Sequence, residues 1–69
     1  MSSRTTYKTI TTRLYATEHG EQLNARNRAF RLEDLNGYGQ HGYVLTGTVT
    51  APEHDGIIII DTLALTENY

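Results

Sequence analysis

The stretch IIIIDTLAL, residues 57–65, is the most apolar part of the chain and decides the fold. Two earlier stretches, TTYKTITTRLYA (5–16) and YVLTGTVT (43–50), alternate β-branched and aromatic residues with others, as half-buried strands do. Pro52 and Gly56 predict a turn between the second and third strands, which should therefore pair as an antiparallel hairpin. The most apolar strand should lie in the centre of the sheet.

Between the first two strands, three residues recur at the spacing of one helix face: Leu32, Leu35 and Gly39. This pattern predicts a short helix that begins at Asn27 or Arg31 and ends at Tyr38. Residues 21–30, EQLNARNRAF, fit either a loop with a helical tendency or a short extra strand. The sequence predicts a single α+β domain over residues 1–69, in the order β-α-β-β. We expect a three-stranded sheet of order 1-3-2 with one helix on one face.

The four consecutive isoleucines break the alternation expected of a strand that has one face under a helix and one face in water. We expect Ile58 and Ile60 to face the helix, with Ile57, Ile59, Leu63 and Leu65 on the opposite face. A large apolar patch of this kind is typical of an interface, so these four residues are predicted to form a homodimer or higher oligomer through the sheet. The alternative is that residues 21–30 fold over that face.

The size of the chain also favours self-association. A domain of 69 residues is marginally stable without further support. With 0 cysteines, no disulfide can supply that support, and the three histidines lack the spacing of metal ligands. We expect no metal and no cofactor, and a partner subunit as the source of additional burial.

Charge and hydropathy narrow the class of protein further. The formal net charge is −2 and the isoelectric point is about 5.8, which disfavours a nucleic-acid partner. No apolar run approaches the ~20 residues of a membrane span, and the N-terminus lacks the apolar region of a secretory signal. The expected location is the cytoplasm.

The stretch NGYGQHGY, residues 36–43, has the G-x-G-x-x-G spacing of a dinucleotide-binding loop. Such a loop follows a strand and opens a helix, whereas these glycines end a helix and lead into a strand. We therefore interpret them as a helix-to-strand corner, in which Gly39 or Gly42 takes the left-handed conformation that closes a helix.

The longer stretch LNGYGQHGYVLTG, residues 35–47, resembles the signature of a family of small bacterial and phage proteins, the domain of unknown function numbered forty-one seventy-seven. The matching residues are Leu35, Asn36, Gly39, Gly42, Tyr43 and Leu45. Tyr43 stands where the family usually has Trp, and the chain has no Trp. The resemblance implies a fold rather than an activity, because the family brings no established catalytic residues.

Two groups of side chains are candidate contacts for a ligand or a partner. Arg26, Arg28 and Arg31 could together hold a phosphate or an acidic surface, or else form an ordinary solvated charge run. Tyr38 and His41 could stack on a ligand, or else cap the helix end.

No pair of residues argues for catalysis, and we expect the protein not to be an enzyme. The first hypothesis is a small non-catalytic binding or regulatory protein that acts as a homo-oligomer packed through its sheet. The alternative, which the resemblance to a family with phage members implies, is a phage-encoded inhibitor of a host system. Such a protein would act in the host cytoplasm, where it would block a host protein or sequester a small anionic or nucleotide signal.

Overall fold

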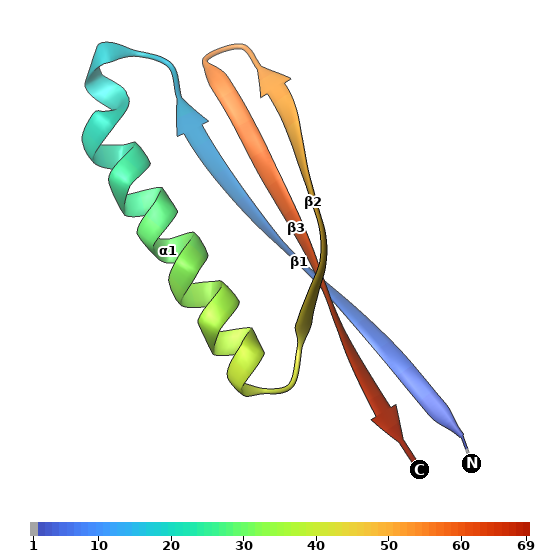
Figure 1. Cartoon of the computed structure of the whole chain (residues 1–69). Helices are drawn as coiled ribbons and strands as arrows, with labels where there is room; N and C mark the ends of the chain where they lie inside the picture. The colour runs from blue at the N-terminus through green and yellow to red at the C-terminus, as the bar shows by residue number, and fades with distance from the viewer. Residues whose placement is uncertain (1) are drawn as a thin grey trace.

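The computed structural model describes residues 2–69 and contains one sheet and one long helix (Figure 1). The elements in chain order are β1 (Ser3–Tyr15), the 3-10 turn η1 (Glu18–Gly20), α1 (Glu21–Gln40), β2 (Val44–Glu53) and β3 (Gly56–Asn68). β3 lies between β1 and β2 and is antiparallel to both. The predicted α+β class, the β-α-β-β order and the strand order 1-3-2 are confirmed.

β1 and β3 extend well beyond β2. They remain paired from Tyr15–Gly56 to Ser3–Asn68, whereas the outermost β2 pair toward the chain termini is Val44–Ala64. Residues 3–6 and 65–68 therefore form a two-stranded ribbon that no third strand flanks, and Figure 1 shows it projecting away from α1. We refer to these eight residues as the terminal arm.

α1 is much longer than predicted, because it begins at Glu21 and includes the whole of the ambiguous segment 21–30. The residues that lie against the sheet recur with helical spacing but are mostly polar: Asn24, Asn27, Arg31, Leu35 and Tyr38 are half-buried. An apolar stripe could not reveal a helix whose contact face is polar. The segment still favours a helix because it has no proline and contains Ala, Leu, Gln and Arg, which are good helix formers.

The predicted orientation of the isoleucines is wrong by one residue. The register places Ile57 and Ile59 on the same side as Asp61, Leu63 and Leu65. That side faces the helix, because Asp61 accepts hydrogen bonds from Arg31 of α1. A charged aspartate ordinarily lies on the solvent side of a strand, but here Arg31 binds it on the helix side, so the side chains of the run face the opposite way to the prediction. The predicted interface residues therefore lie on the helix side of the sheet, and the face opposite the helix carries Ile58 and Ile60.

A second difference occurs in β2. Tyr43, Leu45, Gly47 and Val49 alternate in sequence, but a bulge between Leu45 and Gly47 inserts Thr46. Leu45 consequently pairs with Leu63 on the helix side, while Val49 pairs with Ile60 on the opposite side. The bulge exchanges the two faces of the strand part-way along it, which no strict alternation of residues can predict.

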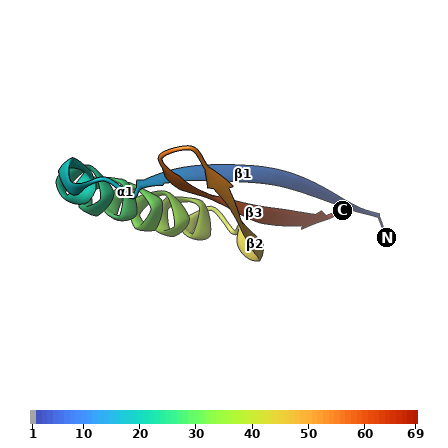
Figure 2. The ribbon, with the colours of Figure 1, turned by 90° about the horizontal axis from the view of Figure 1, so that it is seen from above.

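The hydrophobic core is very small. Among residues 2–69, only two large apolar side chains are buried, Ile10 of β1 and Leu63 of β3. No side chain of α1 is fully buried. Figure 2, which views the molecule from above, shows the helix lying along one side of a thin, strongly twisted sheet. The molecule is 54 × 21 × 10 Å in extent. A single sheet with one helix beside it leaves most apolar side chains at the surface.

Candidate functional site

The centre of the sheet holds a buried ion pair. Arg31 of α1 donates from Nε to Asp61 Oδ2 at 2.7 Å and from an Nη to Oδ1 at 2.9 Å. Thr48 of β2 donates its hydroxyl to the same Oδ1 at 2.7 Å. The Asp61 side chain is 0% exposed and that of Arg31 is 30% exposed. A fork of two parallel hydrogen bonds fixes the position of the helix relative to the central strand.

The electrostatics of this pair are consistent with its geometry. Hydrogen bonding from the Arg31 guanidinium lowers the pKa of the Asp61 carboxyl below its usual range, and the Thr48 hydroxyl acts in the same direction. Burial alone would raise that pKa. Asp61 is therefore ionised at neutral pH, with all its buried oxygen atoms satisfied. We interpret the cluster as a structural lock between α1, β2 and β3.

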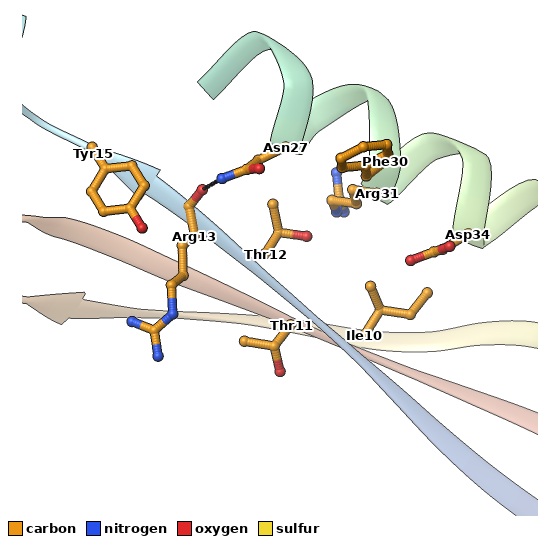
Figure 3. Close-up of a pocket in the computed structure, with 9 residues that line it drawn as sticks. All are labelled: Ile10, Thr11, Thr12, Arg13, Tyr15, Asn27, Phe30, Arg31 and Asp34. Carbon is orange, nitrogen blue, oxygen red and sulfur yellow. Dashed lines mark hydrogen bonds between the residues drawn. The ribbon is translucent and has the colours of Figure 1, made fainter. Parts of the chain in front are cut away.

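The amino-terminal part of α1 occupies one edge of the sheet. Asn24 accepts a hydrogen bond from the Tyr15 backbone N–H and donates to the Tyr15 carbonyl, both at 2.7 Å. Asn27 donates to the Arg13 carbonyl at 2.9 Å, the bond drawn dashed in Figure 3. These amides take the place that a neighbouring strand would occupy. The last residues of β1 are thus unavailable to another strand.

Tyr38 and His41 are both used at the end of the helix. Tyr43 N–H bonds to the Tyr38 carbonyl and Gly42 N–H to the Gly39 carbonyl, with Gly42 at a φ of 91°. This is a Schellman cap, and the Tyr38 and Tyr43 rings make its usual apolar contact at 5.4 Å between centroids. His41 Nδ1 lies 2.9 Å from the Gly37 carbonyl. The left-handed closure is confirmed at Gly42, while Gly39 lies inside the helix.

The structure does not gather the three arginines. Arg31 is engaged by Asp61, and it lies on the sheet-facing side of α1. Arg26 and Arg28 are exposed, and a separation of two residues places them on different sides of a helix. The hypothesis that these three arginines bind a phosphate or an acidic surface would need their side chains to converge, and they do not.

A groove of about 470 Å³ runs between α1 and β1. In Figure 3, Ile10 and Thr12 point from β1 toward the helix, with Asp34 near Ile10 and Phe30 near Arg31. Phe30 is more than half exposed. The sequence offered no signal for this groove, because its walls come from a strand and a helix whose relative placement depends on the Arg31–Asp61 pair. Its chemistry is mixed, because the helix contributes the apolar Phe30, the acidic Asp34, the ion-paired Arg31 and the amide of Asn27.

The sheet face opposite the helix, which we call the open face, carries a row of apolar side chains that α1 does not cover. Its central strand contributes Ile58, Ile60 and Ala64, and β2 contributes Val44, Val49 and Ala51. Val49 is 64% exposed and Val44 65% exposed. β1 contributes Tyr7, Thr9, Thr11 and Arg13, and the ion pair Arg13–Glu53 closes one end of the face.

Comparisons with known proteins return no match: no protein-family model, no curated protein and no solved structure resembles the chain closely enough to be matched. The resemblance of residues 35–47 to the domain family numbered forty-one seventy-seven therefore stays a prediction. Within residues 2–69, no helix is long and apolar enough to cross a membrane. The same residues contain no group of three His, Cys, Asp or Glu side chains placed to hold a metal ion.

Proposed function

We propose that this chain is a small non-catalytic binding or regulatory protein that acts as a homo-oligomer, with its copies packed through the open face of the sheet. The observation that carries the proposal is the apolar centre of that face, formed by Ile58, Ile60, Val49 and Ala51. Nothing among residues 2–69 covers it, because α1 lies on the other side. Apolar surface of this kind is typical of protein interfaces.

The surface area of the chain supports a partner of ordinary size. The accessible surface is 5263 Å² for a mass of 7.8 kDa. A compact monomer of that mass exposes roughly 4,400 Å², so the excess is about 900 Å². A standard interface buries about 800 Å² on each partner. The radius of gyration, 14.7 Å, also exceeds the roughly 11 Å of a compact domain of this length.

We propose a homo-oligomer rather than a complex with a second protein because the open face is complementary to a second copy of itself. It has an apolar centre and carries both charges of the Arg13–Glu53 pair at one end. Two copies related by a two-fold axis can oppose their apolar centres and place Arg13 of each near Glu53 of the other. Such an isologous contact needs no additional component.

The decisive experiment compares two glutamate substitutions at residues of similar exposure. Val49→Glu charges the open face, whereas Leu32→Glu charges the outer surface of α1, where the side chain is 61% exposed. Sedimentation equilibrium should show an assembly for the wild type and for Leu32→Glu, and at least about tenfold weaker association for Val49→Glu. Circular dichroism checks that both variants are folded. Association that is unaffected by Val49→Glu, or a wild-type monomer at millimolar concentration, would refute the proposal.

A further inference from the structure

The outer edge of β1 has unused backbone hydrogen-bonding groups. Ser2 and Tyr69 exchange both backbone hydrogen bonds. The backbone N–H and C=O groups of even-numbered residues in β1 therefore point toward β3, and those of odd-numbered residues point away from the sheet. The helix asparagines occupy two of the outward residues, Arg13 and Tyr15. Within the described chain, no hydrogen bond reaches the outward backbone groups of the remaining odd-numbered residues: Ser3, Thr5, Tyr7, Thr9 and Thr11.

The free edge coincides with the least supported part of the fold. The terminal arm has only two strands, and neither β2 nor α1 extends along it (Figure 1). An isolated two-stranded ribbon is marginally stable in water, and three or more strands are normally needed. The arm is nevertheless fully paired as far as Ser3–Asn68. A third strand along the arm would supply the missing support.

We propose that this third strand is β1 of a second copy of the chain, paired antiparallel along the outer edge of β1 with the two-fold axis at Tyr7. Ser3 of each copy then lies opposite Thr11 of the other. The two sheets become one continuous sheet of six strands, three from each copy. This contact uses a strand edge, so it is independent of the open face and can form whether or not that face pairs.

Two features of β1 select this register. Pairing centred nearer the carboxyl end of the strand would need outward groups of Arg13 and Tyr15, which Asn24 and Asn27 already occupy. Pairing centred on Thr6 would place Lys8 directly opposite Arg4, and like charges in that position are destabilising. In the register centred on Tyr7, Arg4 faces Ile10 and Lys8 faces Thr6. It is the longest pairing that avoids both conflicts.

The groove beside β1 gives the pairing a complementary charge. Arg4 lies on the helix side of the sheet, since it is an even-numbered residue like Ile10. In the proposed pairing, Arg4 of one copy lies opposite Ile10 of the other, where Asp34 and Phe30 line the groove. Neither Arg4 nor Asp34 has an ion-pair partner within residues 2–69. The arm of each copy would thus enter the groove of the other, with its arginine beneath an aspartate.

A charge exchange tests this contact. Arg4→Glu and Asp34→Arg should each weaken association at the edge by about tenfold or more, because each places like charges together. The double variant Arg4→Glu/Asp34→Arg restores the opposite charges and should recover wild-type affinity. Both residues are exposed, but Arg4 also stacks on the Tyr69 ring and lies directly across the strands from Glu67. Circular dichroism of Arg4→Glu therefore checks that the chain is still folded, and recovery in the double variant is the result that the contact with Asp34 alone explains. Measurements in the Val49→Glu background isolate the edge contact from any contact through the open face.

The register is tested by distance. The chain has no cysteine, so Tyr7→Cys and Thr11→Cys each introduce a single reactive site. In the proposed pairing the two copies of residue 7 meet at the axis and should cross-link through a short bifunctional reagent. The two copies of residue 11 are eight residues apart along the strands, about 27 Å at 3.4 Å per residue, which a spin-label measurement should report. Equal cross-linking at both positions, no recovery in the double variant, or a monomer in the Val49→Glu background would overturn the proposal.

Discussion

Replacing Arg31 with methionine removes the guanidinium but keeps a long apolar side chain over the sheet. In the wild type the Asp61 side chain is 0% exposed, and without Arg31 its remaining hydrogen-bond donor is the Thr48 hydroxyl. Breaking a buried ion pair by removing one partner costs about 3–5 kcal/mol, and the 30% exposure of Arg31 places the expected loss near the lower end, about 3 kcal/mol. A 69-residue domain has a free energy of unfolding of only roughly 3.5–10 kcal/mol in total.

Removing the other partner of the ion pair should lower the free energy of unfolding by less. Asp61→Leu leaves Arg31, whose long side chain can turn its charge toward water, so the expected loss is about 1–2 kcal/mol. The double variant Arg31→Met/Asp61→Leu contains no buried charge and should be more stable than Arg31→Met alone. Urea unfolding followed by circular dichroism at one protein concentration measures all four chains. Equal losses in the two single variants would show that the buried carboxylate is not the source of the cost.

The free energies of unfolding of the wild type and of Arg31→Met should depend differently on pH. The folded state lowers the pKa of Asp61 below 3.8, so the contribution of the pair is fully present above about pH 4 and is lost as the pH falls through the folded-state pKa. Without Arg31, burial instead raises the pKa of Asp61, and the folded state then binds the proton more readily than the unfolded chain. The difference in the free energy of unfolding between the wild type and Arg31→Met should therefore decrease as the pH falls from 7 to 4. A deficit independent of pH would contradict the reasoning.

Four further substitutions test local features by the same unfolding assay. Gly42→Ala should lower the free energy of unfolding by about 1 kcal/mol because φ is 91°, whereas Gly39→Ala, within the helix and with open space around the added methyl group, should raise it by about 0.5–1 kcal/mol. Gly56→Ala should cost more than about 2 kcal/mol, since its Cβ would lie 2.0 Å from a backbone oxygen of β1. Asn24→Ala should leave the Tyr15 backbone groups unpaired, cost about 1–3 kcal/mol, and accelerate amide exchange at Tyr15; unchanged exchange would argue against the edge cap.

The sheet could be predicted because its signals are local. The turn around Pro52 and Gly56, the alternation in the first two strands and the apolar run at 57–65 suffice for three strands in the order 1-3-2. The helix end was also readable, since a glycine is needed where the backbone turns left-handed. The beginning of the helix was not, because Asn24 and Asn27 face β1 as hydrogen-bonding groups and leave no apolar stripe.

The sequence by itself determined the strands and the helix-to-strand corner. It also indicated that a domain of 69 residues without cysteine buries too little surface to be more than marginally stable on its own. Only the tertiary structure decided which face of β3 lies under the helix. A strand of consecutive isoleucines offers two nearly equivalent faces, and an ionised aspartate would ordinarily turn toward solvent. Arg31, thirty residues away in the sequence, pairs with Asp61 and offsets the cost of burying its charge. With this long-range pair, Ile57 and Ile59 lie on the helix side of the sheet, and Ile58 and Ile60 lie on the open face.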